Sequence, residues 1–289
     1  MKAFKSKYTL IALALTFLAG ISACEKDVVL DLADIEGKYL IVEANLIDDG
    51  SRQWIRLTRS SSYYDVNTGD AVQEAKVIVE GNDQSFEFNE LYPDSLPGYY
   101  FNSQISSQLT ETLYQLHIET ADNNTYFAQS VLRPLPVLDS VTVAINPFSE
   151  FNFFDNTVYD VIAHFADLPG KGDHYLFNLY INRKLKTPRP SDKAPMSDVN
   201  LDEYSSYAVL TINEDDILPG DTITLEMRSI SKEKFDFYNI FFFQTDLSGN
   251  PFAGAPPANI PTNLSEGARG FFQVSAVTRK STIFEPLQQ

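Results

Sequence analysis

Tyr114-Gln115-Leu116-His117-Ile118-Glu119 carries the clearest structural signal in this chain of 289 residues. Apolar and polar side chains alternate along it, which is the pattern of a β-strand with one buried face. Thr222–Arg228 repeats the pattern, with Ile223, Leu225 and Met227 as its apolar members. We expect further strands over Lys38–Leu46, Gln53–Arg59, Ala75–Glu80, Ser85–Glu90, Tyr126–Leu132, Ser140–Ile145, Thr157–Phe165, Tyr175–Ile181, Tyr207–Ile212 and Gly270–Thr278.

Turn-forming residues separate the expected strands. Clusters rich in Gly, Pro, Asn and Asp occur at Asp48-Asp49-Gly50, Gly81-Asn82-Asp83, Leu96-Pro97-Gly98, Asp122-Asn123-Asn124 and Leu218-Pro219-Gly220. Many short strands at this spacing, with few helical runs, are typical of antiparallel sandwiches and not of an α/β sheet. The sequence therefore predicts an all-β protein.

Two prolines in Arg133-Pro134-Leu135-Pro136 mark the expected domain boundary, because a stiff, extended connector of this kind does not complete a central strand. We expect two antiparallel β-sandwich domains, an N-terminal immunoglobulin-like one over residues 38–133 and a C-terminal one over residues 134–289. Lys184–Asn200 contains three prolines among charged residues and is expected to form a long surface loop.

One short helix is expected in the C-terminal domain, near residues 232–246. Ser231 is a suitable N-terminal cap, and Glu233 lies in the first turn, where a negative charge is favourable. Phe235, Tyr238 and Phe242 recur at helical spacing and predict the buried face.

The N-terminus carries a targeting signal. Three lysines precede an apolar segment, Tyr8–Gly20, which is too short to span a bilayer stably. Ile21-Ser22-Ala23 then leads to Cys24, the only cysteine, in an arrangement that resembles the lipobox of bacterial lipoproteins. We expect a signal peptide over residues 1–23, a membrane anchor through lipid on Cys24 and an acidic tether over residues 24–37. An ordinary secretory peptide with a chance cysteine is the alternative.

The chain is strongly acidic, with a net charge of −17. Removal of residues 1–23, which carry three lysines and no acid, leaves 19 basic and 39 acidic residues and a net charge of about −20. Such a charge repels nucleic acid and disfavours a nucleic-acid partner. The acidic residues after Cys24 resemble signals that send some lipoproteins to the cell surface, and a plain solvated tether is the alternative.

Motifs of enzymatic chemistry are absent from the sequence. It contains no Gly-x-Ser-x-Gly, no His-Glu-x-x-His and no phosphate-binding loop that ends in Gly-Lys-Ser/Thr. His117, His164 and His174 have no His or Cys partner at ligand spacing, and we expect exposed strand residues at these positions. We therefore expect no catalytic residue, no metal site and no cofactor.

Aromatic side chains are the better candidates for function. Phe148, Phe151, Phe153 and Phe154 lie between two expected strands and are candidate partner contacts. In the alternative, these rings close the base of the second sandwich. Tyr63-Tyr64 and Tyr99-Tyr100-Phe101 leave the same choice between the edge of the core and a contact surface.

A series of short motifs runs in a specific order along the chain. It includes Leu40-Ile41-Val42-Glu43-Ala44, Leu96-Pro97-Gly98-Tyr99-Tyr100, the Pro-x-Pro connector with Leu138-Asp139-Ser140-Val141, and Gly267-x-x-Gly270-Phe271-Phe272. Together these resemble a Bacteroidetes family of outer-membrane lipoproteins that is catalogued as a domain of unknown function, number 4249. The resemblance implies an all-β exported lipoprotein, in a family commonly encoded beside TonB-dependent receptors. It supplies no catalytic residue.

These features predict a non-enzymatic outer-membrane lipoprotein that is an accessory or binding partner of a TonB-dependent transport system. We expect it at the periplasmic or the cell-surface face, with the surface favoured. A stand-alone adhesin or glycan-binding module is the first alternative, and a hydrolase whose acid and base come from distant loops is the second. The sequence leaves the ligand and the oligomeric state open.

Overall fold

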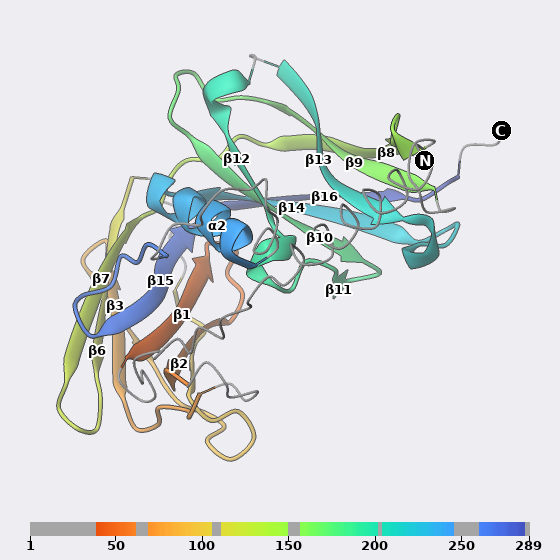
Figure 1. Cartoon of the computed structure of the whole chain (residues 1–289). Coiled ribbons are helices and arrows are strands. Elements are labelled where there is room, and N and C mark those ends of the chain that lie inside the picture. Colours follow the sequence, from red (N-terminus) through yellow and green to blue (C-terminus); the bar gives the residue numbers. More distant parts are fainter. Residues whose placement is uncertain are drawn as a thin grey trace, which may run out of the picture. The chain divides into compact units, whose positions relative to one another are not determined.

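The computed structural model describes residues 39–61, 69–105, 111–149, 157–201, 204–245 and 260–286. The chain divides into two compact units, Met1–Asp34 and Ile35–Gln289, and all described residues belong to the second. Strands dominate, and the sheets are mostly antiparallel, so the predicted all-β class is confirmed (Figure 1). Within the described ranges, no helix is long and apolar enough to cross a membrane.

The first sandwich contains two four-stranded sheets. One has the order β15 (Ala268–Ser275), β1 (Leu40–Ile47), β2 (Gln53–Arg59), β5 (Tyr99–Asn102). The other has the order β4 (Gln84–Phe88), β3 (Lys76–Gly81), β6 (Leu113–Glu119), β7 (Thr125–Val131). Both sheets supply one hydrophobic core, in which Tyr114, Leu116 and Ile118 are buried while His117 and Glu119 are exposed. The alternation of β6 therefore has the predicted orientation.

The second sandwich is built in the same way. One sheet has the order β11 (Lys184–Leu185), β10 (His174–Ile181), β14 (Thr222–Ile230), β16 (Val277–Ile283), with β12 (Ala194–Ser197) also paired to β10. The other has the order β13 (Tyr204–Asn213), β9 (Val158–Ala166), β8 (Leu138–Ile145). Phe165, Tyr175 and Phe177 lie fully buried in its core, and their rings contact one another.

One strand departs from the expected division at residues 133 and 134. β15 pairs in parallel with β1, and Leu264, Phe272 and Val274 belong to the core of the first sandwich. The predicted strand Gly270–Thr278 is also two strands, since β15 ends at Ser275 and β16 continues from Val277 in the other sandwich. Part of the expected C-terminal domain, residues 134–289, therefore belongs to the first sandwich. Alternation cannot reveal this, because it gives the buried face of a strand but not its partner.

Gly270 allows this parallel pairing. It has a φ of +105°, and a Cβ atom at this position would lie 2.1 Å from the carbonyl oxygen of Val42 on β1. Only glycine fits a backbone approach of this kind without displacement of the neighbouring strand.

The helix α2 (Lys232–Thr245) confirms the predicted helix. Ser231 caps it, because the Lys234 N–H donates to Ser231 Oγ at 3.1 Å. The predicted inward position of Phe242 is wrong, since its side chain is 40% exposed. Phe237 instead makes the inward contacts, with its ring 5.7 Å from Phe271 of β15, so α2 lies beside this strand as well as beside β12 (Figure 1).

The segment Lys184–Asn200, expected to be a surface loop, is ordered and partly buried. It forms β11, β12 and the short 3-10 helices η2 (Pro190–Asp192) and η3 (Asp198–Asn200). Asp198 is fully buried, and its carboxylate accepts the Gly172 N–H at 2.9 Å. The loop prediction was wrong because prolines are tolerated in an edge strand, which is where Pro195 lies.

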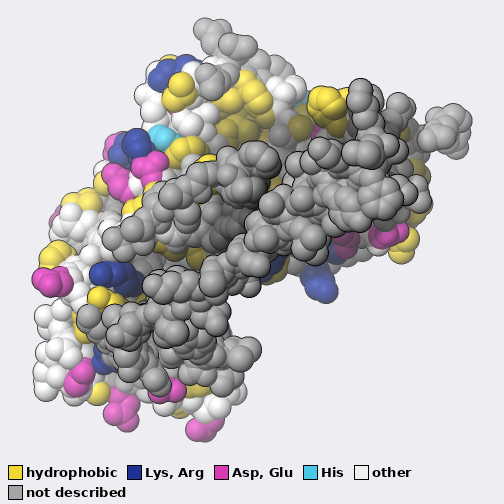
Figure 2. Space-filling view, viewed as in Figure 1, with side chains coloured by type: hydrophobic (Ala, Val, Ile, Leu, Met, Phe, Trp, Pro, Cys, Tyr) yellow, Lys and Arg dark blue, Asp and Glu magenta, His cyan; other side chains and the backbone are white. Residues whose placement is uncertain are grey.

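Acidic side chains of the described residues are scattered over the visible part of the face shown in Figure 2. The described His, Cys, Asp and Glu side chains form no cluster of three or more that could hold a metal ion.

Candidate functional site: an exposed aromatic row

Strands β2 and β5 present an exposed row of aromatic side chains on one face of the first sandwich. Trp54 lies directly opposite Phe101, and Arg56 lies directly opposite Tyr99. The Trp54 side chain is 40% exposed, and Tyr99 and Phe101 are half-buried. Strand geometry explains the arrangement, because alternate residues point to the same face. We call Trp54, Tyr99, Phe101 and the nearby Tyr92 the aromatic row.

Tyr100 points the other way, into the core. It is 1% exposed, and its hydroxyl donates to the Val72 carbonyl oxygen at 2.9 Å. Burial raises the pKa of Tyr100 to about 12. Of the three residues Tyr99-Tyr100-Phe101, Tyr100 therefore lies in the core, and Tyr99 and Phe101 lie at the surface.

The rings of the row contact one another in sequence. The ring centres of Trp54 and Tyr99 are 5.4 Å apart, and those of Tyr99 and Phe101 are 6.3 Å apart with nearly parallel planes. Tyr92 adds an edge-on contact, 5.6 Å from Phe101. Contacts at these separations stabilise aromatic pairs by about 0.5–1.5 kcal/mol each beyond area burial, so the rings support one another.

Two arginines accompany the row. The guanidinium of Arg52 lies 6.0 Å from the ring centre of Phe101, and its Nη1 donates to the Tyr92 hydroxyl at 3.2 Å. The guanidinium of Arg56 lies 5.4 Å from the ring centre of Tyr99. Among the described residues, Arg56 Nε has no hydrogen-bond acceptor although it is buried. The row thus combines flat apolar surface with donors for a ligand.

The residues singled out from the sequence are placed only in part. Phe148 is 71% exposed, so its ring does not close the base of the second sandwich. Phe151, Phe153, Phe154, Cys24 and Tyr63-Tyr64 lie outside the described residues, as do the expected signal peptide and tether.

The three histidines lie far apart and make ordinary polar or ring contacts. His164 is held between two hydroxyls, with Nε2 2.7 Å from Thr142 Oγ1 and Nδ1 2.7 Å from Ser206 Oγ. His117 Nε2 lies 3.8 Å from a Glu80 carboxylate oxygen, and the ring centre of His174 lies 4.9 Å from that of Phe235.

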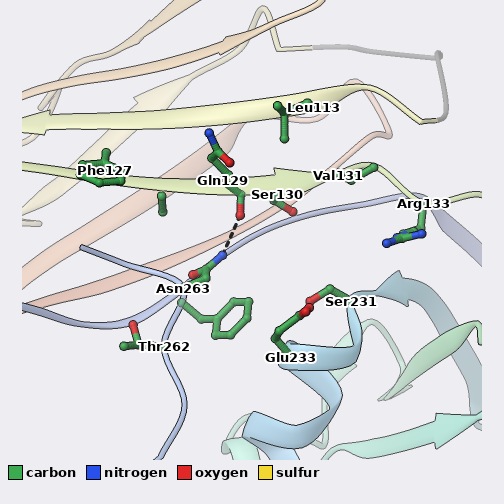
Figure 3. Close-up of a pocket in the computed structure, with 12 residues that line it drawn as sticks. Leu113, Phe127, Gln129, Ser130, Val131, Arg133, Ser231, Glu233, Thr262 and Asn263 are labelled. Atoms are coloured by element: carbon green, nitrogen blue, oxygen red, sulfur yellow. Dashed lines mark hydrogen bonds between the residues drawn. The ribbon is translucent and has the colours of Figure 1, made fainter. Parts of the chain in front are cut away.

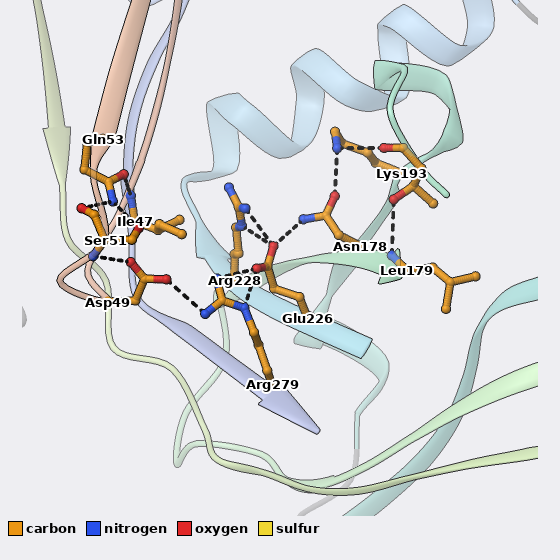
Figure 4. A network of polar contacts seen from close by, with 11 residues as sticks. Ile47, Asp49, Ser51, Gln53, Asn178, Leu179, Lys193, Glu226, Arg228 and Arg279 are labelled. Atoms are coloured by element: carbon orange, nitrogen blue, oxygen red, sulfur yellow. Dashed lines mark hydrogen bonds and ion pairs between the residues drawn. The ribbon is translucent and has the colours of Figure 1, made fainter. Parts of the chain in front are cut away.

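Glu226 carries a buried carboxylate, although it lies on the strand face of β14 that alternation predicts to be solvent-exposed. Its side chain is fully buried and accepts hydrogen bonds from Arg228 at 2.7 Å, Arg279 at 2.7 Å and Asn178 at 2.9 Å (Figure 4). Burial alone would raise the pKa of Glu226, but the two guanidinium groups outweigh it and hold the pKa below its usual value. A carboxylate held this way stays ionised and does not suit general acid catalysis, which needs a raised pKa.

The Glu226 network connects the two sandwiches. Arg279 on β16 also donates to Asp49, in the turn between β1 and β2, at 2.9 Å (Figure 4). Only the spacing that places Glu226 and Arg228 on one strand face points to this network in the sequence.

A hollow of about 530 Å³ lies along the edge of β7 (Figure 3). The Asn263 side chain extends toward this edge and donates to the carbonyl oxygens of Gln129 at 2.9 Å and Phe272 at 2.7 Å. The Phe127 N–H donates to Ser265 Oγ at 3.1 Å. These contacts protect the strand edge from pairing with another chain, and the aromatic row remains the better candidate site.

Comparison with known proteins agrees with the order of motifs along the chain. The model of the family described as "Domain of unknown function (DUF4249)" matches residues 25–281. The chain belongs to this family. No curated protein matches this chain.

Two solved crystal forms of a cytokine receptor complex share weak similarity with this DUF4249 protein. Each is 10% identical with a TM-score of 0.25, and the matches cover 67% and 85% of this chain and 92% and 98% of theirs. Similarity of this degree supports neither a fold assignment nor a function.

Proposed function

We propose that this DUF4249 protein is a non-enzymatic outer-membrane lipoprotein, anchored through Cys24, that binds a partner or cargo of a TonB-dependent transport system through the aromatic row. The observation that carries the proposal is the exposure of Trp54 beside Tyr99 and Phe101, with Arg52 and Arg56 over the rings. Tryptophan, tyrosine and arginine are the residue types that contribute most to protein–protein affinity.

The proposed mechanism is positional. Two or three acyl chains on Cys24 would hold the protein in the membrane, because each buried methylene contributes about 0.8 kcal/mol. The acidic tether would give the sandwich reach. The row would then engage the partner with little loss of side-chain entropy, since the rings already contact one another.

A glycan-binding module is the second candidate, and the shape of the row favours it. The Trp54 ring, 40% exposed and in contact with Tyr99, offers an apolar face on which a sugar ring can lie. Arg52 and Arg56 lie over the neighbouring rings and can donate hydrogen bonds to sugar hydroxyls.

The test is affinity purification of the tagged, full-length protein from detergent-solubilised outer membrane, followed by mass spectrometry. We expect a stoichiometric TonB-dependent barrel with the wild-type chain and its loss in Trp54→Ala. Phe127→Ala is the matched control, because Phe127 is a still more exposed ring, at 60%, on a different sheet. Cys24→Ala tests separately whether the anchor is needed.

Two results would overturn the transport proposal. One is the absence of any barrel from a folded, lipidated wild-type preparation. The other is a barrel that Trp54→Ala and Phe127→Ala retain equally, which would place the contact elsewhere. Saturable binding on a glycan array that Trp54→Ala removes, with no barrel co-purified, would favour the second candidate.

A further inference from the structure

A second feature of this molecule is a cavity of about 520 Å³ between strands β1 and β15, strands β10 and β14, and helix α2. Its volume lies in the range of small-molecule sites. Trp54 and Arg52 line it too, so it continues from the aromatic row. Its charge is opposite to that of the chain, because the described lining has Glu43 as its one carboxylate and four cationic side chains: Arg52, Lys193, Arg228 and Lys234.

Lys234 is the most unusual of these groups. Its side chain is 3% exposed, and its Nζ lies 4.4 Å from the ring centre of Phe237, 4.9 Å from that of Tyr238 and 4.6 Å from that of Phe271. No described residue forms a hydrogen bond or an ion pair with this ammonium group. A buried ammonium group without a hydrogen-bonded counter-charge is costly, and three ring faces replace only part of its hydration.

The neighbours of Lys234 leave it short of negative charge. Burial, together with the positive charges of Lys193 and Arg228, lowers its pKa to about 7, while Glu43 acts in the opposite sense. Glu43 is already paired with Arg56, with 3.1 Å between Oε1 and Nη1. Tyr238, whose ring also faces the ammonium, has a pKa raised by burial and is therefore neutral.

The other two inner cations are satisfied to different degrees. Arg228 pairs with the buried Glu226 at 2.7 Å. Lys193 Nζ donates to Asn178 Oδ1 at 2.7 Å and to the Thr187 carbonyl oxygen at 3.0 Å, both uncharged acceptors (Figure 4). Burial and the nearby Arg228 lower the pKa of Lys193 to about 8, while Glu226 and Asp192 act in the opposite sense. The half-buried Lys193 and the buried Lys234 therefore both line the cavity, and neither forms an ion pair with a described residue.

We propose that this cavity binds a small organic anion, with its carboxylate or phosphate at Lys234 and Lys193 and its apolar part against the rings of Phe237 and Phe271. The anion supplies the counter-charge that the described residues do not, and the rings supply an apolar wall. This inference does not rest on the function proposed for the aromatic row, since the row and the inner cations are separate sets of residues.

The test is isothermal titration calorimetry of the full-length chain with benzoate and with phenyl phosphate, which share a ring and differ in the anionic group. We expect at least one probe to bind, and Lys234→Met to weaken it at least tenfold. Lys232→Met is the matched control, because Lys232 lies two residues away on the same helix, is largely exposed and pairs with Asp236. We expect this control to bind as the wild type does.

A second measurement needs no variant. At pH 8, binding of an anion should be accompanied by proton uptake, because the anion raises the pKa values of Lys234 and Lys193 toward that of an ordinary lysine. Titrations in two buffers of different ionisation enthalpy measure this uptake. Affinity should also fall between pH 6 and pH 9.

The outcomes separate cleanly. Binding that Lys234→Met removes and Lys232→Met retains supports the site, and the preferred probe identifies carboxylate or phosphate as its anion. Failure of both probes to bind the folded wild type, or binding without proton uptake that Lys234→Met retains, overturns it. In that case the ammonium is only a packing element under α2.

Discussion

Glu43 on β1 accepts a hydrogen bond from Arg56 on β2, with 3.1 Å between Oε1 and Nη1, and the pair lies between the aromatic row and the cationic cavity. Glu43 lines the cavity, while the guanidinium of Arg56 lies over Tyr99 of the row. Phe271, the cross-strand neighbour of Glu43 on the other side, contacts Lys234. One line of cross-strand neighbours therefore connects the two candidate binding surfaces.

Substitution in the aromatic row should weaken partner binding without unfolding the protein. Trp54→Ala should weaken partner binding about 30-fold, which corresponds to about 2 kcal/mol for a residue that anchors an interface. Its thermal midpoint should stay close to that of the wild type, because much of the ring is exposed in the free protein. Binding assays paired with thermal denaturation check both, and a large drop in the midpoint would show that Trp54 is structural.

The Glu226 network predicts a strong effect on stability. Glu226→Gln should lower the free energy of unfolding by about 2 kcal/mol, because it leaves the largely buried Arg228 without its carboxylate, while Arg279 is 38% exposed and keeps Asp49 as a partner. Glu233→Gln on the exposed face of α2 serves as the control and should be nearly neutral. Urea denaturation at pH 7 measures the difference.

The same network predicts a pH dependence. The pKa of Glu226 is lower in the folded chain than in the unfolded chain, so its contribution to stability is present above the unfolded value. It is lost as the pH falls through the lowered folded value. The gap between wild type and Glu226→Gln should therefore narrow below about pH 4 in urea titrations. A gap that stays constant down to pH 2 would contradict this account.

Substitution of Lys234 should have the opposite effect on stability and give a variant that is more stable than the wild type. With a folded pKa of about 7 and an ordinary unfolded value, the unfolded chain binds more protons between these limits, so wild-type stability should rise with pH above 7. Lys234→Met removes this dependence and should stabilise the chain by about 1 kcal/mol or more at neutral pH in anion-free buffer. Denaturant midpoints from pH 6 to pH 10 test this. A destabilised Lys234→Met would show that the ring contacts outweigh burial.

The close approach of Gly270 to Val42 predicts a large loss of stability when Gly270 is substituted. Gly270→Ala should destabilise the chain by about 3 kcal/mol or more, because its Cβ would overlap the Val42 carbonyl oxygen. Gly50→Ala is the control, since Gly50 also has a positive φ but has no atom within 4 Å of the added Cβ, and it should cost about 1 kcal/mol. Equal losses in the two variants would exclude the close approach as the cause.

Local patterns predicted much of this fold from the sequence. Alternation placed β6 and β14, and Ser231 was identified as a cap because both signals depend on neighbouring residues alone. The burial of Glu226 was not predictable, since it requires Arg279, a residue 53 positions away, to arrive on the same face. Alternation along β5 could assign Tyr100 to the core only once the face of the sheet was known.

The cavity was the least predictable part of the site. Lys234 lies among aromatic residues in a helical pattern, where a lysine is ordinarily solvated. Its burial arises because α2 contacts β10 of one sandwich and the Phe271 ring of the other. No periodicity in the sequence records a contact between two sandwiches.

The parallel pairing of β15 with β1 also has a consequence for biogenesis. A chain that emerges N-terminus first has made β1 through β7 long before residues 268–275 appear, and until then β1 has an open edge and the core lacks Phe272 and Val274. Long-range pairings of this kind form slowly. The first sandwich therefore closes only after residues 268–275 have been made, and its folding waits for a segment more than 200 residues downstream of β1.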